Sequence, residues 1–372
     1  MPRDVLEHSP LSGMDEYPIH QTTDPIRFLN TTDPRAFERY WFSAQSDDGE
    51  LFFVCGIGLY PNLNRCDGYA IVVQDNRHTA IRAARTLGVD RSELTVGPMT
   101  ARMIEPFTEW RLNCAPNDFG LEYDLAWRDT KRAVFGRQGP TEIPGQMNAR
   151  LIHDWCGYET FGTIEGAISV HGKKFTLTPS RFRGSRDHHW GVRDGVGGAG
   201  HMLQTSSSSH LGQWVEFGDW SIWWHRVLYN LGDARQGAGK ITPIDHKVRF
   251  DPVTRHLVEA VITNRLDNGE IREVHYEQIG NQIAYLRCGM YTGPDGKGTP
   301  AENYHHGSIA GDFIGGETFD LSDPAVRTEI AGFEDHLVRA TCNGESAIGI
   351  LECRNPVIYE MCEKGLPGFS FL

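Results

Sequence analysis

Turn signals recur about every ten residues along this chain of 372 residues, and this spacing limits the possible folds more than any other feature. Clusters of Asn, Asp, Gly and Pro separate short runs that are apolar or that alternate apolar and polar side chains. The runs that we expect to be strands are 51–60, 69–73, 167–170, 175–177, 213–224, 247–250, 257–263 and 347–352. The clearest hairpin is expected to join 257–266 to 271–277 through Asp267-Asn268-Gly269, because Asn-Gly supplies the positive φ angles of a tight turn. The sequence therefore predicts a mainly antiparallel β protein.

Helical signals are few by comparison. Residues 34–40 follow a Thr-Asp cap and are expected to form a helix. Residues 79–87 carry apolar side chains at helical spacing and are also predicted to be helical. Short helical turns are expected at 323–329 and 360–364.

Two stretches, 129–146 and 195–209, contain glycines and polar residues with little periodicity, and they predict long loops. A chain of this length fits two domains or one large β-rich domain. We place a division near the second loop, which gives two β domains, residues 1–194 and 195–372.

The composition excludes several classes of function. A net charge of −13 provides no basic surface to neutralise phosphates, so no nucleic-acid partner is expected. No window approaches roughly eighteen apolar residues, and no charged and apolar leader opens the chain, so neither a membrane span nor a secretory signal is expected. The eight cysteines are scattered without a CxxC pair, which is typical of free thiols in a cytoplasmic protein. A homodimer is left open.

Residues 184–194 concentrate two arginines, two aspartates, two histidines and a tryptophan between glycines. Buried charges are costly unless they are paired, so a purely structural strand would not gather so many ionisable side chains. Alternation along a strand would place these side chains on two opposite faces, with Arg186, His188 and Trp190 on one and Asp187 and His189 on the other. One face can then line a cavity while the other anchors the strand.

Asp187 and one of the two histidines are predicted to form a general acid–base pair, with the carboxylate fixing the imidazole tautomer. The sequence does not decide between His188 and His189. Arg186 or Arg193 is expected to stabilise an oxyanion or to hold the aspartate. The alternative is a buried ion-pair network in which the arginines and aspartates of this segment join the two halves of the chain.

Aromatic residues are dense around Trp220. On one strand, Trp220 and Trp224 would share a face, and Trp223 and His225 would share the other. Together with Trp190, these tryptophans are predicted to shape an apolar substrate cavity that excludes water. His225 is expected either to donate a proton or to be a hydrogen-bonded core residue. The alternative for each tryptophan is a place in a barrel core.

Two further groups of polar side chains are candidates for contact with a substrate. Tyr60 and Asn62 follow a predicted strand and are expected to reach a barrel mouth, where they would polarise a substrate oxygen. The alternative is a turn held by Asx hydrogen bonds. Tyr304 and His305 precede a second histidine in a segment that is predicted to gate the cavity or transfer a proton, and the alternative is an exposed histidine pair without function.

No motif for a metal or a cofactor is present. The chain has no HExxH motif and no cysteine pair, and adjacent histidines on a strand point apart, so no metal site is expected. No GxGxxG or P-loop motif occurs in a strand–turn–helix context, and no GxSxG elbow occurs. The chemistry is therefore expected to need no cofactor.

Five motifs occur in the same order in one known group of proteins: Tyr-Pro-Ile-His-Gln at 17–21, Gly-Leu-Tyr-Pro-Asn at 58–62, Asp-Gly-Tyr at 67–69, Val-Gly-Pro at 96–98 and Arg-Asp-His-His-Trp-Gly at 186–191. In these motifs, and over nearly its whole length, the chain resembles the bacterial proteins related to carotenoid 1,2-hydratase and to the AttH family. The resemblance implies two lipocalin-like antiparallel β-barrel domains packed together, with an apolar ligand cavity. It also implies acid–base chemistry without organic cofactor or redox metal, as in carotenoid hydratases, tocopherol cyclases and fungal cyclases that close rings in apolar substrates.

We therefore expect a cofactor-independent lyase or isomerase, which acts as a hydratase or dehydratase, as a cyclase, or by eliminating a small fragment. Its substrate is expected to be a bulky apolar or aromatic small molecule such as a terpenoid, a steroid or a lignin-derived phenolic. The alternative is a non-catalytic, lipocalin-like carrier of an apolar ligand. The density of ionisable groups at 186–194 favours an enzyme, because a carrier needs few buried charges.

Overall fold

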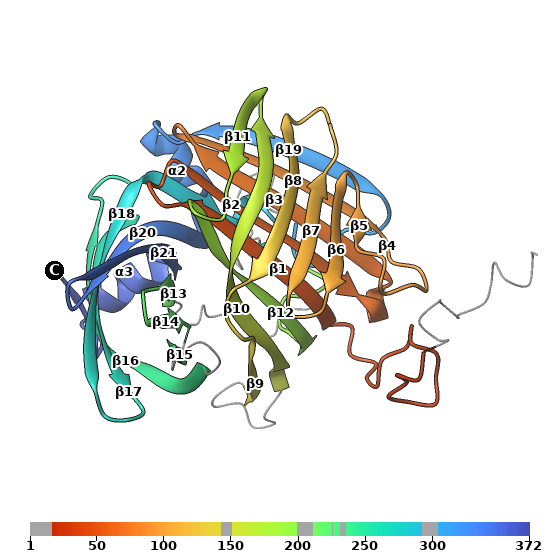
Figure 1. Cartoon of the computed structure of the whole chain (residues 1–372), viewed down its shortest axis with the longest axis horizontal. Coiled ribbons are helices and arrows are strands. Elements are labelled where there is room, and N and C mark those ends of the chain that lie inside the picture. The colour runs from red at the N-terminus through yellow and green to blue at the C-terminus, as the bar shows by residue number, and fades with distance from the viewer. Residues whose placement is uncertain (1–16, 143–150, 199–210, 225, 231–235, 292–303) are drawn as a thin grey trace, which may run out of the picture.

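The computed structural model describes residues 17–142, 151–198, 211–224, 226–230, 236–291 and 304–372. In these residues the chain is mainly β and forms two sheets that lie side by side (Figure 1). Strand pairs are antiparallel apart from one parallel pair near the C-terminus. The predicted fold class, a mainly β protein built from two antiparallel barrel-like sheets, is confirmed.

The first sheet contains thirteen strands: β1 (Ala36–Ser46), β2 (Leu51–Tyr60), β3 (Arg65–Gln74), β4 (Arg77–Thr86), β5 (Thr95–Val96), β6 (Met99–Glu105), β7 (Glu109–Cys114), β8 (Leu121–Asp129), β9 (Val134–Glu142), β10 (Leu151–Val170), β11 (Lys173–Leu177), β12 (Phe182–Val192) and β19 (Phe313–Asp320). Its order is β19-β4-β3-β2-β1-β12-β10-β8-β7-β6-β5, and β9 and β11 also pair with β10. β19 comes from the C-terminal half of the chain and pairs with β4, beside which it lies in Figure 1. The second half thus supplies one strand to the first sheet, and the division at residue 194 stays a prediction.

The second sheet contains nine strands: β13 (Leu211–Glu216), β14 (Trp220–Trp223), β15 (Arg226–Asn230), β16 (Gln236–Phe250), β17 (Leu257–Leu266), β18 (Ile271–Tyr285), β20 (Glu334–Cys342), β21 (Glu345–Cys353) and β22 (Phe369–Phe371). It closes into an eight-stranded barrel because β15 pairs with both β14 and β16. β22 pairs in parallel with the other end of β16. The described residues contain two α-helices, α2 (Pro324–Ile330) and α3 (Asn355–Glu363), and α3 places Ile358 and Cys362 in the core of this barrel.

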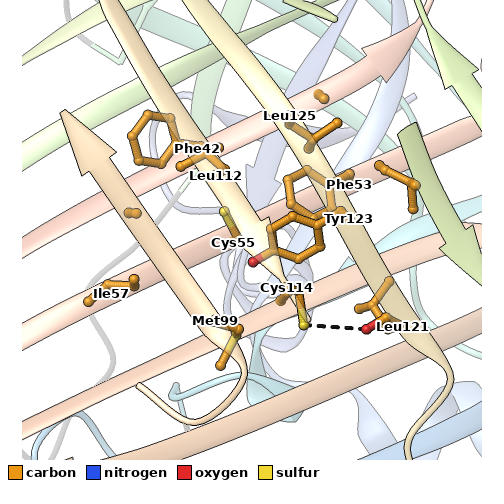
Figure 2. Close-up of a cluster of buried hydrophobic side chains, with 14 of the residues drawn as sticks. Phe42, Phe53, Cys55, Ile57, Met99, Leu112, Cys114, Leu121, Tyr123 and Leu125 are labelled. Carbon is orange, nitrogen blue, oxygen red and sulfur yellow. Dashed lines mark hydrogen bonds between the residues drawn. The ribbon is translucent and has the colours of Figure 1, made fainter. Parts of the chain in front are cut away.

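β2 is buried on both faces, which explains why its sequence is a continuous apolar run. Phe53 and Cys55 point into the core of the first sheet, where Phe53 packs edge-on against Tyr123 with ring centroids 5.0 Å apart (Figure 2). Phe52 and Val54 point the other way, into a core that contains residues of both sheets. This shared apolar core joins the two sheets.

The first sheet curls over its own core until β5 lies against β3. A Cβ atom on Gly68 of β3 would come within 2.7 Å of Val96 Cγ1, so glycine is needed for this approach. Inside the same core the Cys114 thiol donates to the Leu121 carbonyl oxygen at 3.3 Å (Figure 2). The curl gives the first sheet a barrel-like interior although its edge strands do not pair.

Two predicted local elements are confirmed. β17 and β18 form the expected hairpin, with Gly269 at φ +86° in the turn, although Asn268 does not share the positive φ. The helix expected at 323–329 is α2, which Asp323 caps by accepting a hydrogen bond from the Ala325 amide. α3 covers most of the turn predicted at 360–364 but begins at Asn355.

Three predictions about local structure are wrong. Residues 34–40 and 79–87 lie mostly in β1 and β4 rather than in helices, because each of these strands is hydrogen-bonded to a neighbour on both sides. β4 is also buried on both faces, so its apolar residues occur at odd and even positions and imitate helical spacing. The loop expected at 129–146 contains β9, which pairs with β10.

Candidate functional site

β12 lies between β1 and β10, and its side chains alternate between two separate hollows. His188 lies opposite Tyr40 of β1 and Tyr158 of β10, whereas His189 lies opposite Arg39. The predicted alternation of this segment is thereby confirmed. The two adjacent histidines face different surroundings.

The hollow on the side of His188, here called the His188 cavity, has a volume of about 930 Å³. A cavity of this size suits a small organic ligand. Its aromatic lining consists of Phe37, Tyr40, Phe107, Trp110, Tyr158 and Trp190. Its charged lining consists of Asp33, Arg35, Glu38, Arg91 and Asp154.

Glu38 connects His188 to Arg91 at the wall of this cavity. His188 Nε2 lies 2.9 Å from Glu38 Oε1, and Arg91 Nη2 donates to Glu38 Oε2 at 2.8 Å. Burial would raise the pKa of Glu38, but the hydrogen bonds and charges of His188 and Arg91 outweigh it and lower that pKa below its ordinary value. Glu38 is therefore ionised at neutral pH and accepts hydrogen bonds from both neighbours.

Three aromatic rings surround the His188 imidazole. Tyr40 stacks on it with centroids 4.0 Å apart and planes at 19°. Tyr158 lies edge-on at 5.5 Å and Trp190 is tilted at 5.0 Å. Burial, reinforced by the charge of Glu38, raises the pKa of Tyr40, so this hydroxyl stays neutral. The rings hold the plane of the imidazole while Glu38 fixes one of its nitrogens.

Arg186 is on the same face of β12 as His188 and is engaged with Asp129. Its Nε and Nη2 atoms donate to the two Asp129 carboxylate oxygens at 2.7 and 2.5 Å, and its Nη1 donates to the Tyr158 hydroxyl at 3.3 Å. Burial would lower the pKa of Arg186, but the bidentate bond to Asp129 raises it. A permanent cation therefore positions the Tyr158 hydroxyl.

Asp187 lies on the opposite face, together with His189. Asp187 Oδ2 accepts a hydrogen bond from Arg39 Nη2 at 3.2 Å and lies 3.5 Å from His189 Nδ1. His189 Nε2 lies 3.7 Å from Glu159 Oε1. Of the two predicted acid–base pairs, the structure brings Asp187 to His189 and separates it from His188.

Burial shifts the pKa of each titratable group on this second face. It raises the pKa of Asp187, which Arg39 and Arg193 lower in part, and it raises the pKa of Glu159 well above the usual range. It lowers the pKa of His189 well below the ordinary value, and the charges of Arg39 and Arg193 add to this shift. His189 is therefore neutral at neutral pH.

The charged residues of the segment also form buried ion pairs, as the alternative interpretation expects, but these pairs lie within the first half of the chain and do not join the two halves. Arg186 pairs with Asp129 of β8, and Asp187 pairs with Arg39 of β1. Asp194 pairs with Arg35, which directly precedes β1. One stretch of chain thus anchors β12 and presents a histidine to a cavity.

The tryptophans that were expected to line one cavity are divided in the structure. Trp190 lines the His188 cavity, whereas Trp223 and Trp224 line a second hollow of about 520 Å³ between the two sheets, here called the His189 cleft. Trp220 lies in the core of the second barrel, stacked on a phenylalanine with centroids 4.4 Å apart. The predicted alternation is wrong at Trp224, because β14 ends at Trp223 and Trp224 has φ +48°.

Tyr60 and Asn62 line neither hollow. Tyr60 is fully buried and its hydroxyl donates to Asp67 Oδ1 at 2.8 Å. The Asn62 amide donates to the carbonyl oxygens of Thr31 and Asp33, both at 2.8 Å. Thr31 and Asp33 line the His188 cavity. Asn62 therefore holds a part of the cavity wall in place without reaching the cavity itself.

Tyr304 and His305 lie away from both hollows. The Tyr304 ring carries the Arg82 guanidinium over its face at 4.5 Å and packs against Phe313 at 5.2 Å. His305 is buried, and burial lowers its pKa. His225 lies outside the described residues.

Four residues around His188 have no place in the sequence-based site: Glu38, Arg91, Tyr40 and Tyr158. Glu38 and Tyr40 are two positions apart, which puts them on one face of a strand, but the predicted helix at 34–40 hides this signal. Tyr158 lies inside the twenty-residue strand β10 without a local motif, and no sequence signal marks Arg91.

Proton transfer is the chemistry that the His188 cavity offers, through an imidazole, a carboxylate and phenol hydroxyls. Among the residues that the structure describes, no three His, Cys, Asp or Glu side chains come together so as to hold a metal ion. Over the same residues, no helix has the length and apolarity to cross a membrane.

Comparison with known families and structures gives three findings. The model of a family of unknown function (DUF8625) matches residues 11–234. Kievitone hydratase from Nectria haematococca is similar in structure, with a TM-score of 0.45 and 11% identity, over 84% of this chain and 87% of that chain. A candidate AttH from Nitrosomonas europaea has a TM-score of 0.48 and 12% identity, over 90% of this chain and 97% of that chain. No curated protein matches the sequence.

Proposed function

The chain belongs to the DUF8625 family, a family of unknown function, and we propose that it is a cofactor-independent lyase that adds water to, or removes it from, a bulky apolar or aromatic molecule in the His188 cavity. The observation that carries this proposal is the 2.9 Å contact between His188 Nε2 and Glu38 Oε1 at the wall of an aromatic cavity of about 930 Å³. An imidazole oriented by a carboxylate is a general base suited to neutral pH.

Glu38 determines which nitrogen of His188 acts. An ionised carboxylate only accepts hydrogen bonds, so Nε2 carries the proton and Nδ1 presents its lone pair. When Nδ1 takes a proton from the substrate, the negative charge of Glu38 stabilises the imidazolium that forms. Arg91 holds Glu38 in the ionised state.

Tyr158 is the proposed proton donor. In the dehydration direction His188 Nδ1 removes a proton from carbon, a double bond forms, and the carbon–oxygen bond breaks with its electron pair on oxygen. The Tyr158 hydroxyl delivers a proton to that oxygen and water leaves, while Arg186 stabilises the phenolate. The proton on His188 then returns to Tyr158, and the reverse sequence adds water to the double bond.

The lining of the cavity supports an apolar or aromatic substrate. Tyr40 and Trp190 offer aromatic surface to a substrate, and the charges of Glu38 and Arg91 compensate each other. Terpenoids, steroids and lignin-derived phenolics are the substrate classes that we propose. The motif that resembles the carotenoid 1,2-hydratase and AttH-related proteins supplies both His188 and Trp190 to this wall, which supports a hydratase-type reaction. A cytoplasmic location and a homodimer stay predictions.

Paired measurements of binding and turnover test this proposal against the carrier alternative. Wild-type protein is incubated with a panel of alkenes and alcohols from the three classes, with tryptophan fluorescence reporting binding and mass spectrometry reporting gain or loss of water. For the ligand that reacts, we expect His188→Asn and Glu38→Gln to keep affinity within about threefold and to lose turnover by about 10²-fold or more.

The matched control is His275→Asn. His275 Nε2 also lies 2.9 Å from a glutamate, Glu273, but this pair is exposed on the second barrel. Turnover is expected to be unchanged in this variant. Ligands that bind to the wild type and to both cavity variants alike, without any chemical change, would establish the carrier and overturn the enzyme.

A further inference from the structure

The His189 cleft is a second hollow that the proposed reaction does not use. It lies between the two sheets, with β9, β10 and β12 on one side and β13 to β16 with α3 on the other. β12 and β10 separate it from the His188 cavity, and of its lining only Tyr158 reaches both hollows. Apart from Tyr158, the residues that line the cleft take no part in the proposed reaction.

Two cations on neighbouring strands line the cleft, and no carboxylate of the described residues forms an ion pair with either side chain. Arg226 of β15 and Lys240 of β16 are direct cross-strand partners, and both line the cleft. Like charges in this position destabilise a sheet. Among the described residues no carboxylate oxygen lies within 4.0 Å of either cation, whereas the third basic residue, Arg137, pairs with Asp154 at 2.7 Å.

The Arg226 guanidinium extends across the cleft towards the first sheet. Its Nη2 atom lies 3.7 Å from where a Cβ on Gly136 of β9 would stand. Arg226, which reaches towards β9, and Lys240 on the neighbouring strand together form a site for an anion.

Aromatic rings form the interior walls of the cleft. Trp155 lies edge-on to His189 with centroids 4.6 Å apart, and Trp223 and Trp224 line the opposite sheet. Such walls favour a flat apolar body over a small inorganic anion, because rings stack on tryptophan and inorganic anions do not.

The inner end of the cleft carries no opposing charge. Glu159 accepts a hydrogen bond from Trp214 Nε1 at 3.0 Å, and burial raises its pKa well above the usual range, so the carboxyl group is neutral. His189 beside it is neutral as well, because burial lowers its pKa. The two cations at the opening thus dominate the charge of the cleft.

We propose that the His189 cleft is a second binding site, which holds a planar aromatic carboxylate with its ring against the tryptophans and its carboxylate between Arg226 and Lys240.

Isothermal titration of the full chain tests this site with three probes: trans-cinnamate, the uncharged cinnamyl alcohol and the ringless acetate. We expect cinnamate to bind at least about tenfold more tightly than the other two, because each lacks one half of the recognised structure. Arg226→Gln and Lys240→Gln are each expected to weaken cinnamate by about tenfold.

Two controls localise the effect. Lys247→Gln removes the same charge from an exposed position on β16 outside the cleft and is expected to leave cinnamate affinity unchanged. His188→Asn is expected to leave it unchanged too, which separates this site from the proposed active site. Equal affinity for the alcohol, an equal loss in Lys247→Gln, a loss in His188→Asn, or no binding of cinnamate at millimolar concentration would each overturn the proposal.

Discussion

His188 and His189 are neighbours in the chain, but the two sides of β12 give them opposite properties. His188 Nε2 contacts the ionised carboxylate of Glu38 at 2.9 Å. His189 lies among the buried cations Arg39 and Arg193, whose charges oppose protonation. The difference begins on β1, where Glu38 and Arg39 are also consecutive, so the register between two strands decides which histidine meets the carboxylate.

The largest expected effect is on the free energy of unfolding, when Asp187 on one side of β12 and Glu38 on the other are each replaced. Asp187→Leu leaves the buried Arg39 without its ion-pair partner, and we expect it to lower the free energy of unfolding by about 3–5 kcal/mol. Glu38→Leu removes a partner from Arg91, which is more exposed than Arg39 (20% against 8% of the side chain), and should cost less, about 1–2 kcal/mol. Urea denaturation at pH 7 measures both, and equal losses would contradict the contrast.

The turnover of single variants compares the two histidines directly. We expect His189→Asn to retain the turnover of the wild type within about threefold, while His188→Asn loses about 10²-fold or more. Asparagine keeps a polar side chain of similar reach in both positions. Steady-state kinetics with one substrate decides the matter, and a large loss in His189→Asn alone would move the reaction to the other face of β12.

The pH dependence of stability sharpens the same comparison. The folded pKa of His189 lies below its ordinary value of 6.5, so the stability that His189 contributes is present above pH 6.5 and is lost as the pH falls, because the unfolded chain binds a proton that the folded chain does not. This group alone adds a slope of up to about 1.4 kcal/mol per pH unit. We expect His189→Asn to flatten the curve of unfolding free energy between about pH 6.5 and 5, and His188→Asn to leave this part of the slope in place.

The smallest effect is expected for Asn62, whose hydrogen bonds hold residues that line the His188 cavity. Asn62→Ala removes two hydrogen bonds to Thr31 and Asp33, which line this cavity but not the His189 cleft. We expect KM to rise about threefold to tenfold with kcat nearly unchanged. Cinnamate affinity at the cleft serves as the control, and an equal change there would indicate a general loss of structure.

The sequence predicts the β architecture well because turn residues and alternation are local signals. The division of 186–190 between two faces follows from alternation alone, and the structure confirms it. The predicted helix at 34–40 conceals Glu38, since local propensity carries no information about the two strands that pair with β1.

The composition of the two hollows is not predictable from local sequence. Tyr158 reaches His188 only through the pairing of β10 with β12. Trp223 and Trp224 share the His189 cleft because Trp224 leaves strand geometry, a departure that no turn residue announces. Both sites depend on the register between strands that are far apart in the sequence, and the spacing of residue types carries no information about that register.

The pairing of β19 with β4 has a consequence for biosynthesis. β4 leaves the ribosome long before residues 313–320 are made, and until then its outer row of backbone N–H and C=O groups has no partner. Such an edge recruits other nascent chains, so the first sheet is most prone to aggregation while the second barrel is still being translated. A message truncated before these codons would yield a product that cannot cover this edge.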